Sequence, residues 1–181
     1  MKNRRLILNV LVASSVVMAM LFLFQTNIFA FAWHLRHGFH REFNGIRFAV
    51  PLFYQEAQGS TLNEFSIIAN PSPIHKKHAF ITVSFPPWTT DKPLRPMSPE
   101  DAGRIRMTLA GERDARFGNR AGKCVEYTQN RMALDGQERP SGLQPIWITC
   151  RFGEVDVDFD GSRNAVPEFY FLMESANEVK N

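Results

Sequence analysis

Residues 146–161, IWITCRFGEVDVDFDG, contain two short runs in which apolar and polar residues alternate, separated by Gly153. Apolar side chains at every second position are typical of a strand with one buried face. Because almost no chain lies between the runs, the two strands must be antiparallel neighbours. This stretch therefore predicts an antiparallel hairpin with strands at residues 146–152 and 154–159.

Five further runs have strand-like patterns with turn signals at their ends. The pair Asn44-Gly45 is preferred in two-residue type I′ hairpin turns, so we expect a hairpin to open the domain. Its second strand ends at Pro51, because proline cannot donate to a ladder. The other strands are expected at residues 64–69, 78–85 and 123–128.

Two helices are expected beside these strands. Residues 98–101, SPED, combine an N-cap serine, a proline at the first helical position and acids in the first turn, which predicts a helix over residues 99–116. After Pro167, apolar residues recur at helical spacing. The predicted fold is α+β, an antiparallel sheet covered by a middle helix and a C-terminal helix. The apolar positions of the C-terminal helix are Phe169, Leu172, Met173 and Ala176.

The layout of these elements resembles that of Mog1/PsbP-like domains, including many membrane-anchored bacterial proteins of uncharacterised function. The resemblance covers roughly residues 43–176 and implies a binding or assembly module, without any catalytic motif or functional residue to carry over. Its segments are FNGIRFAVP (43–51), the middle helix, GKCVEY (122–127), and ITCRFGEVDVDFDG (148–161) leading into PEFYFLMES (167–175).

The N-terminal segment is long enough to cross a membrane. Residues 6–24 carry no charge, and apolar character continues to Trp33, which exceeds the ~20 residues that a spanning helix needs. Lys2, Arg4 and Arg5 precede the segment, so the positive-inside bias places the N-terminus in the cytoplasm and the rest of the chain outside. We expect Trp33 at the membrane interface.

The same segment also fits a cleavable signal peptide. Residues 25–27, QTN, interrupt it, and residues 30–32, AFA, resemble a small-residue cleavage site. An uncharged stretch this long exceeds the ~7–15 residues of a signal peptide's apolar region, which favours a retained single-pass anchor in the cytoplasmic (inner) membrane over secretion after cleavage. The expected division is a cytoplasmic tip and transmembrane anchor over 1–33, a juxtamembrane segment over 34–42, and one extracytoplasmic domain over 43–181.

The charge of the folded part argues against nucleic acid as a partner. Formal net charge is +3, but the 21 basic residues include Lys2, Arg4 and Arg5, and the 18 that remain equal the 18 acidic residues. A neutral domain has no large positive field to attract a polyanion, although basic residues gather between Arg104 and Lys123. The expected partners are membrane lipid, through the N-terminal helix, and another envelope protein.

Three alternate carboxylates, Asp156, Asp158 and Asp160, are the sharpest local pattern, because an EF-hand calcium loop begins in this way. Counted from Asp156, however, position 12 is Pro167 rather than a bidentate Glu, and the residues between the acids are apolar. We therefore favour the solvated face of a strand over these weak metal candidates, and expect neither a metal nor a cofactor.

Three histidines, His34, His37 and His40, are spaced so that a helix would bring them near one face. Metal binding and pH sensing both use histidine. Since only Glu42 is nearby to complete a ligand set, we favour a basic segment at the level of the lipid headgroups.

The two cysteines, Cys124 and Cys150, give conflicting indications. Export to an oxidising compartment favours a disulfide between them. Strand alternation instead groups Cys124 with Glu126 but Cys150 with Ile148, which would place the thiols on opposite faces. We predict a bonded pair, with two separate thiols as the alternative, and no catalytic role because no histidine is placed to activate either one.

The sequence contains none of the GxSxG, HExxH, P-loop, GxGxxG, paired CxxC or SxxK motifs. The favoured hypothesis is a non-catalytic binding or assembly module, tethered beside another envelope component. The alternative is an extracytoplasmic enzyme whose site is assembled from scattered residues, near Trp88 in the proline-rich segment or near the three aspartates.

We predict that the full-length protein sediments with membranes and resists carbonate extraction, because release would expose the uncharged residues 6–24 to water. Carbonate washing followed by N-terminal sequencing of the pellet checks this. A mature chain beginning at Phe31 or Trp33 would show that the segment is removed.

Overall fold

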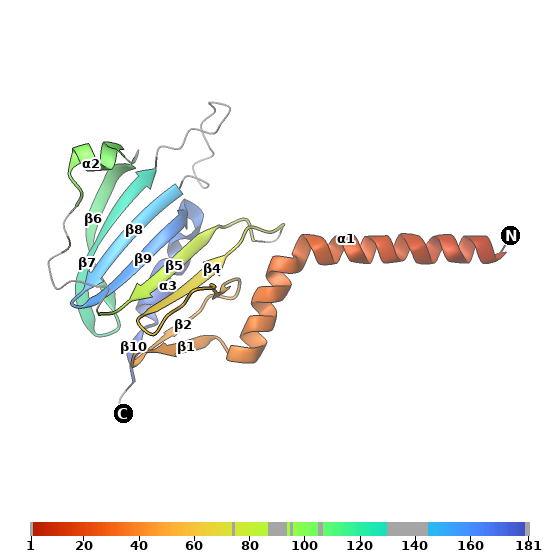
Figure 1. Ribbon diagram of the computed structural model, residues 1–181, viewed down its shortest axis with the longest axis horizontal. Coiled ribbons are helices and arrows are strands. Elements are labelled where there is room, and N and C mark those ends of the chain that lie inside the picture. The colour runs from red at the N-terminus through yellow and green to blue at the C-terminus, as the bar shows by residue number, and fades with distance from the viewer. Residues whose placement is uncertain are drawn as a thin grey trace.

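The computed structural model describes residues 2–73, 75–86, 94, 96–104, 107–129 and 145–179. A long helix, α1 (Lys2–His37), precedes an α+β domain with two antiparallel sheets (Figure 1). The large sheet has the order β3-β4-β5-β9-β8-β7-β6. Its strands are β3 (Gln55–Glu56), β4 (Glu64–Ala69), β5 (Ala79–Ser84), β6 (Met107–Phe117), β7 (Arg120–Gln129), β8 (Pro145–Phe152) and β9 (Val155–Ser162).

The small sheet has the order β1-β2-β10, with β1 (His40–Phe43), β2 (Ile46–Ala49) and β10 (Asn177–Glu178). The remaining elements are α2 (Pro99–Arg104), the 3-10 turn η2 (Arg163–Ala165) and α3 (Val166–Glu174). Asn44 and Gly45 have φ values of 48° and 75°, as the predicted type I′ turn between β1 and β2 requires. The predicted β8–β9 hairpin is confirmed, with β9 and β8 inside the large sheet.

The core lies between one face of the large sheet and a second layer formed by α3 and the small sheet (Figure 1). Phe48 of β2 packs against Phe65 and Phe117 of the large sheet, and Phe159 of β9 packs against Phe169 of α3. Aromatic pairs at these spacings add to the burial of apolar area. The predicted α+β class and the packing of the C-terminal helix on the sheet are therefore correct.

The middle helix is much shorter than predicted. Ser98 caps it as expected, accepting a hydrogen bond from the Asp101 amide at 3.1 Å, but α2 ends at Arg104 and residues 107–117 form β6. β6 is the edge strand, and most of its side chains are exposed, so it lacks the alternation that marks a half-buried strand. Pairing with β7 outweighs the helical propensity of this charged stretch.

The predicted disulfide is present: Cys124 of β7 lies directly opposite Cys150 of β8, and the two are bonded. The alternation argument against the bond was wrong. It assumed that Glu126 marks an exposed face, whereas Glu126 pairs with Ile148 and projects from the same side as the core. The polar residues of β7 on that side lie where the second layer does not cover the sheet.

α1 bends sharply, so that one limb projects from the domain and the other lies against it (Figure 1). Residues 9–23 are exposed, and partial burial begins at Phe24. We call residues 6–24 the spanning limb and residues 25–37 the docked limb. Within the described chain this helix is the one that is long and apolar enough to span a membrane, a property that a signal sequence shares.

We predict that replacing both Cys124 and Cys150 by Ala lowers the free energy of unfolding by about 3 kcal/mol. The disulfide closes a loop with a sequence separation of 26, and the unbonded denatured chain gains the corresponding entropy. Urea unfolding of the two proteins measures the difference. A loss below about 1 kcal/mol would contradict the chain-entropy argument.

Candidate functional site

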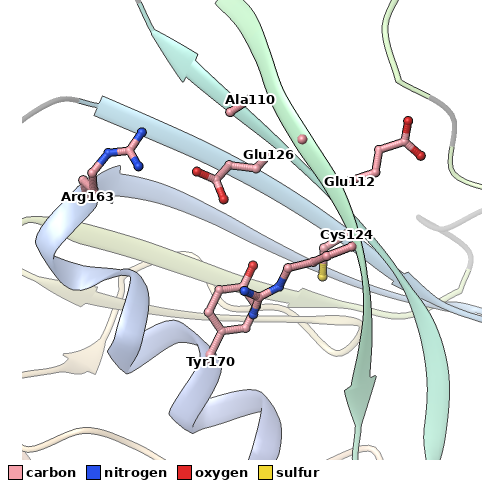
Figure 2. Close-up of a pocket in the computed structure, with 8 residues that line it drawn as sticks. Ala110, Glu112, Cys124, Glu126, Arg163 and Tyr170 are labelled. Atoms are coloured by element: carbon pink, nitrogen blue, oxygen red, sulfur yellow. The ribbon is translucent and has the colours of Figure 1, made fainter.

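A groove of about 420 Å³ opens between α3 and the core-facing side of β6 and β7 (Figure 2). In Figure 2 the side chains of Glu126 and Arg163 extend into the space between the helix and the strands, and Tyr170 of α3 lies at its lower end. Eight residues line it: Ala110, Gly111, Glu112, Arg113, Cys124, Glu126, Arg163 and Tyr170.

The groove exists because the covering helix is short. A nine-residue helix is about 14 Å long and, with its side chains, about 10 Å wide, whereas an eleven-residue strand extends about 36 Å. α3 therefore covers β6 near Phe117, which is buried, and Tyr170 lies over Arg113. Towards Ala110 the same face of the outer strands is left open.

Arg113 and Tyr170 form the closed end of the groove. The Arg113 guanidinium carbon lies 3.2 Å from the centroid of the Tyr170 ring, in cation–π contact. The Tyr170 hydroxyl is buried and finds no hydrogen-bond partner in the part of the chain that the structure describes. Burial raises the pKa of Tyr170, against the opposing effect of Arg113, so the hydroxyl remains a proton donor at neutral pH.

Two further charges face the groove from opposite sides. Arg163 begins η2, and Glu126 projects from β7 (Figure 2). Among the described residues neither side chain forms an ion pair, and the Arg113 guanidinium lies against the Tyr170 ring. Guanidinium groups bind carboxylate and phosphate oxygens in pairs, so the two arginines and the hydroxyl can hold an oxyanion. Glu126 would disfavour a second negative charge on the same ligand.

The three aspartates named from the sequence lie on the opposite face of the sheet from this groove. Asp156 accepts two hydrogen bonds from the Arg151 guanidinium, at 2.7 and 2.8 Å, and Asp160 is exposed. No group of three potential metal ligands occurs among the residues that the structure describes. Trp88, the other location suggested for an enzyme site, lies outside those residues.

Asp158 is the perturbed member of this row. Burial raises its pKa to about 6, the Asp156 charge acts in the same direction, and the hydrogen bond from the Thr149 hydroxyl opposes them. The alternation predicted a solvated acidic face, but burial affects one of its three carboxyl groups. Its middle carboxyl is held in a poorly hydrated place on the outer side of the sheet.

Two residues expected at the lipid headgroups instead contact the domain. His34 is 2% exposed, and its ring nitrogens lie 3.0 Å from the carbonyl oxygens of Gly38 and Pro51, so its side chain faces the domain. Trp33 packs against the core, with the Arg41 guanidinium 5.8 Å from its ring. The C-terminal end of α1 is therefore part of the folded domain.

A second polar cluster fixes the start of α3. Glu168 accepts hydrogen bonds from the Tyr54 hydroxyl at 3.0 Å and the Lys77 ammonium at 2.6 Å, and the buried His75 lies 3.6 Å away. Burial acts to raise the pKa of Glu168, but these three partners outweigh it and hold the pKa below its usual value. The cluster joins three segments that are distant in sequence, so we assign it a structural role.

The residues of the groove were missed from the sequence because no motif connects them. Arg113 was noted only as one of several basic residues between Arg104 and Lys123, and β6 was expected to be a helix. One feature of the sequence could have indicated the groove. If Cys124 is bonded to Cys150 and faces the core, then Glu126, two residues further along the same strand, must face the same side. An acid beside a buried cysteine indicates an opening in the core layer.

No protein-family model and no curated protein matches this chain. Among solved structures, the chain is similar to cyanobacterial PsbP (CyanoP) from Synechocystis sp. PCC 6803, with 11% sequence identity and a TM-score of 0.42. The similarity covers 74% of this chain and 86% of that one. CyanoP belongs to the PsbP kind of protein whose layout the sequence resembles, but a similarity at this TM-score carries no argument about this chain.

We predict that Asp158→Asn removes part of the pH dependence of stability between pH 4 and 6. The folded pKa of Asp158 lies above the unfolded value, so the folded state binds its proton more tightly. That contribution is present below the unfolded pKa and is lost as pH rises through about 6. Relative to wild type, the variant should gain about 2 kcal/mol between pH 4 and pH 7.5.

Urea unfolding at several pH values measures this difference. Asp160→Asn is the matched control, because it removes an exposed carboxylate from the same face of the same strand. Equal behaviour of the two variants would show that Asp158 is not perturbed by burial.

Proposed function

We propose that this protein is a non-catalytic binding module, anchored in the cytoplasmic membrane by α1 with its domain outside, and that its groove holds an oxyanion carried by another envelope component. The observation that carries the proposal is the convergence of Arg113, Arg163 and the Tyr170 hydroxyl on one groove, with no internal ion pair for either arginine in the described chain. The two arginines are exposed and the Tyr170 hydroxyl is buried, and an oxyanion in the groove would accept hydrogen bonds from all three groups.

The position of the groove supports a tethered role. β6 and β7 form the side of the large sheet that is remote from α1 (Figure 1). A ligand in the groove would therefore meet the domain away from the anchor, where a second envelope component has access. The open shape of the groove suits a group that projects from a larger partner better than a small molecule that must be enclosed.

The docked limb supports retention of α1 over removal by a signal peptidase. The cleavage site suggested by residues 30–32 lies in that limb, and Ala30 is 1% exposed against the domain. Removal at this site would take Ala30 away and uncover the surface beneath it, whereas His34 and the two carbonyls that it contacts would stay together. The burial of Ala30 therefore favours a chain that keeps the helix.

We predict that inorganic phosphate raises the melting temperature of the full-length protein in detergent, and that Arg163→Gln abolishes the rise. An oxyanion at roughly tenfold its Kd stabilises the folded state by about 1.4 kcal/mol, which is a shift of a few degrees for a domain of this size. Differential scanning calorimetry against chloride at equal ionic strength provides the measurement, and acetate distinguishes a carboxylate from a phosphate ligand.

Arg116→Gln is the control for the loss of one arginine, because Arg116 projects from the face of β6 opposite to Arg113 and does not line the groove. It should retain the shift. An equal shift in all three proteins would indicate a general salt effect, and no shift in wild type would argue against an oxyanion site.

A further inference from the structure

The docked limb of α1 has two faces of different character. One face is buried against the domain and includes Ala30 at 1% and His34 at 2% exposure. The other face carries Ile28, Phe31 and Leu35 at helical spacing, with exposures of 45%, 53% and 74%. Large apolar side chains in a continuous exposed row indicate a surface that meets something other than water.

The bend in α1 determines what this row faces. The spanning limb projects away from the domain, and the docked limb runs across the base of that projection, between the domain and the spanning limb (Figure 1). A bilayer crossed by the spanning limb would therefore extend alongside the docked limb. Because Ala30 and His34 are buried against the domain, the exposed row would face that bilayer.

The depth of the docked limb is consistent with the headgroup region. Residues 6–24, at about 1.5 Å per residue, extend about 28 Å, close to the ~30 Å of a hydrocarbon core. The polar residues Gln25, Thr26 and Asn27 then fall where the helix leaves the hydrocarbon. Ile28 follows directly, so the docked limb begins at the level of the lipid headgroups.

We propose that the docked limb is an interfacial helix, with Ile28, Phe31 and Leu35 inserted among the headgroups and upper acyl chains and the exposed Arg36 beside the lipid phosphates. This rests on the proposed anchor and adds that the membrane surface itself is a ligand of the folded domain. Lipid covers the exposed row because the docked limb is covalently continuous with the spanning limb and lies at interfacial depth. The contact holds the domain in one orientation, with the groove remote from the bilayer.

The test places a nitroxide label at single introduced cysteines in the full-length protein, reconstituted in vesicles of phosphatidylethanolamine and phosphatidylglycerol. The native cysteines are bonded and buried, so an introduced cysteine is the one that reacts. Leu35→Cys and Phe31→Cys report on the docked limb, and Phe22→Cys, 72% exposed, reports on the spanning limb. Leu62→Cys, at an 88% exposed position in the loop before β4, is the aqueous control.

The accessibility of each label to oxygen and to a water-soluble nickel chelate is measured by electron paramagnetic resonance. We expect the oxygen-to-nickel ratio to be highest at Phe22 and several-fold higher at Phe31 and Leu35 than at Leu62. A lipid-like value at Phe22 with Leu35 equal to Leu62 would overturn the interfacial helix and leave the anchor intact. Aqueous values at all four positions would overturn the anchor as well.

Low accessibility of Leu35 to both reagents would also overturn the proposal, since it would mark contact with protein, such as a second copy of this chain. A labelled protein whose thermal unfolding matches that of wild type confirms that these exposed positions tolerate the label. The four labels together therefore separate lipid, water and protein as the environment of the row.

Discussion

The structure depends on the burial of one face of the large sheet beneath a second layer that is smaller than the sheet. β5, β9 and β8 supply most of the apolar side chains of that face, and α3 and β2 cover them through Phe169 and Phe48. The Glu168 cluster holds this layer in place, because the side chains of Tyr54, Lys77 and His75 surround the Glu168 carboxylate. Because the cover is short, the outer strands are left partly open, and the polar residues that line the groove are the consequence.

The second consequence concerns the N-terminal helix. An exposed apolar helix with a flexible connection would leave the domain free to rotate above the membrane. Here the helix continues into the domain, where the His34 ring nitrogens lie 3.0 Å from the Gly38 and Pro51 carbonyl oxygens and Trp33 packs on the core. With α1 as the proposed anchor, one continuous helix would set both the position and the orientation of the domain, and the groove would lie on the side of the domain remote from that helix (Figure 1).

Where the sequence misled, it did so through the same assumption, that polarity marks a solvent-facing surface. Glu126 faces the core layer, His34 is buried, and Asp158 lies in a poorly hydrated place, although each is polar. For β6 the difficulty was the reverse. An edge strand with most side chains exposed has no buried face to impose a period of two, so the capped helix start at Ser98 was extended too far.

Local residue patterns were enough to predict the strands with one buried face, the Asn44-Gly45 turn, the C-terminal helix and the long apolar segment, because each depends on the spacing of neighbouring residues. The three-dimensional packing was needed to show which face of β7 is inside, that Cys124 lies opposite Cys150, and that Arg113, Glu126, Arg163 and Tyr170 line one groove. These outcomes depend on strand register and on how far α3 extends across the sheet. Register and layer size are properties of pairing between distant segments, and local spacing carries no information about them.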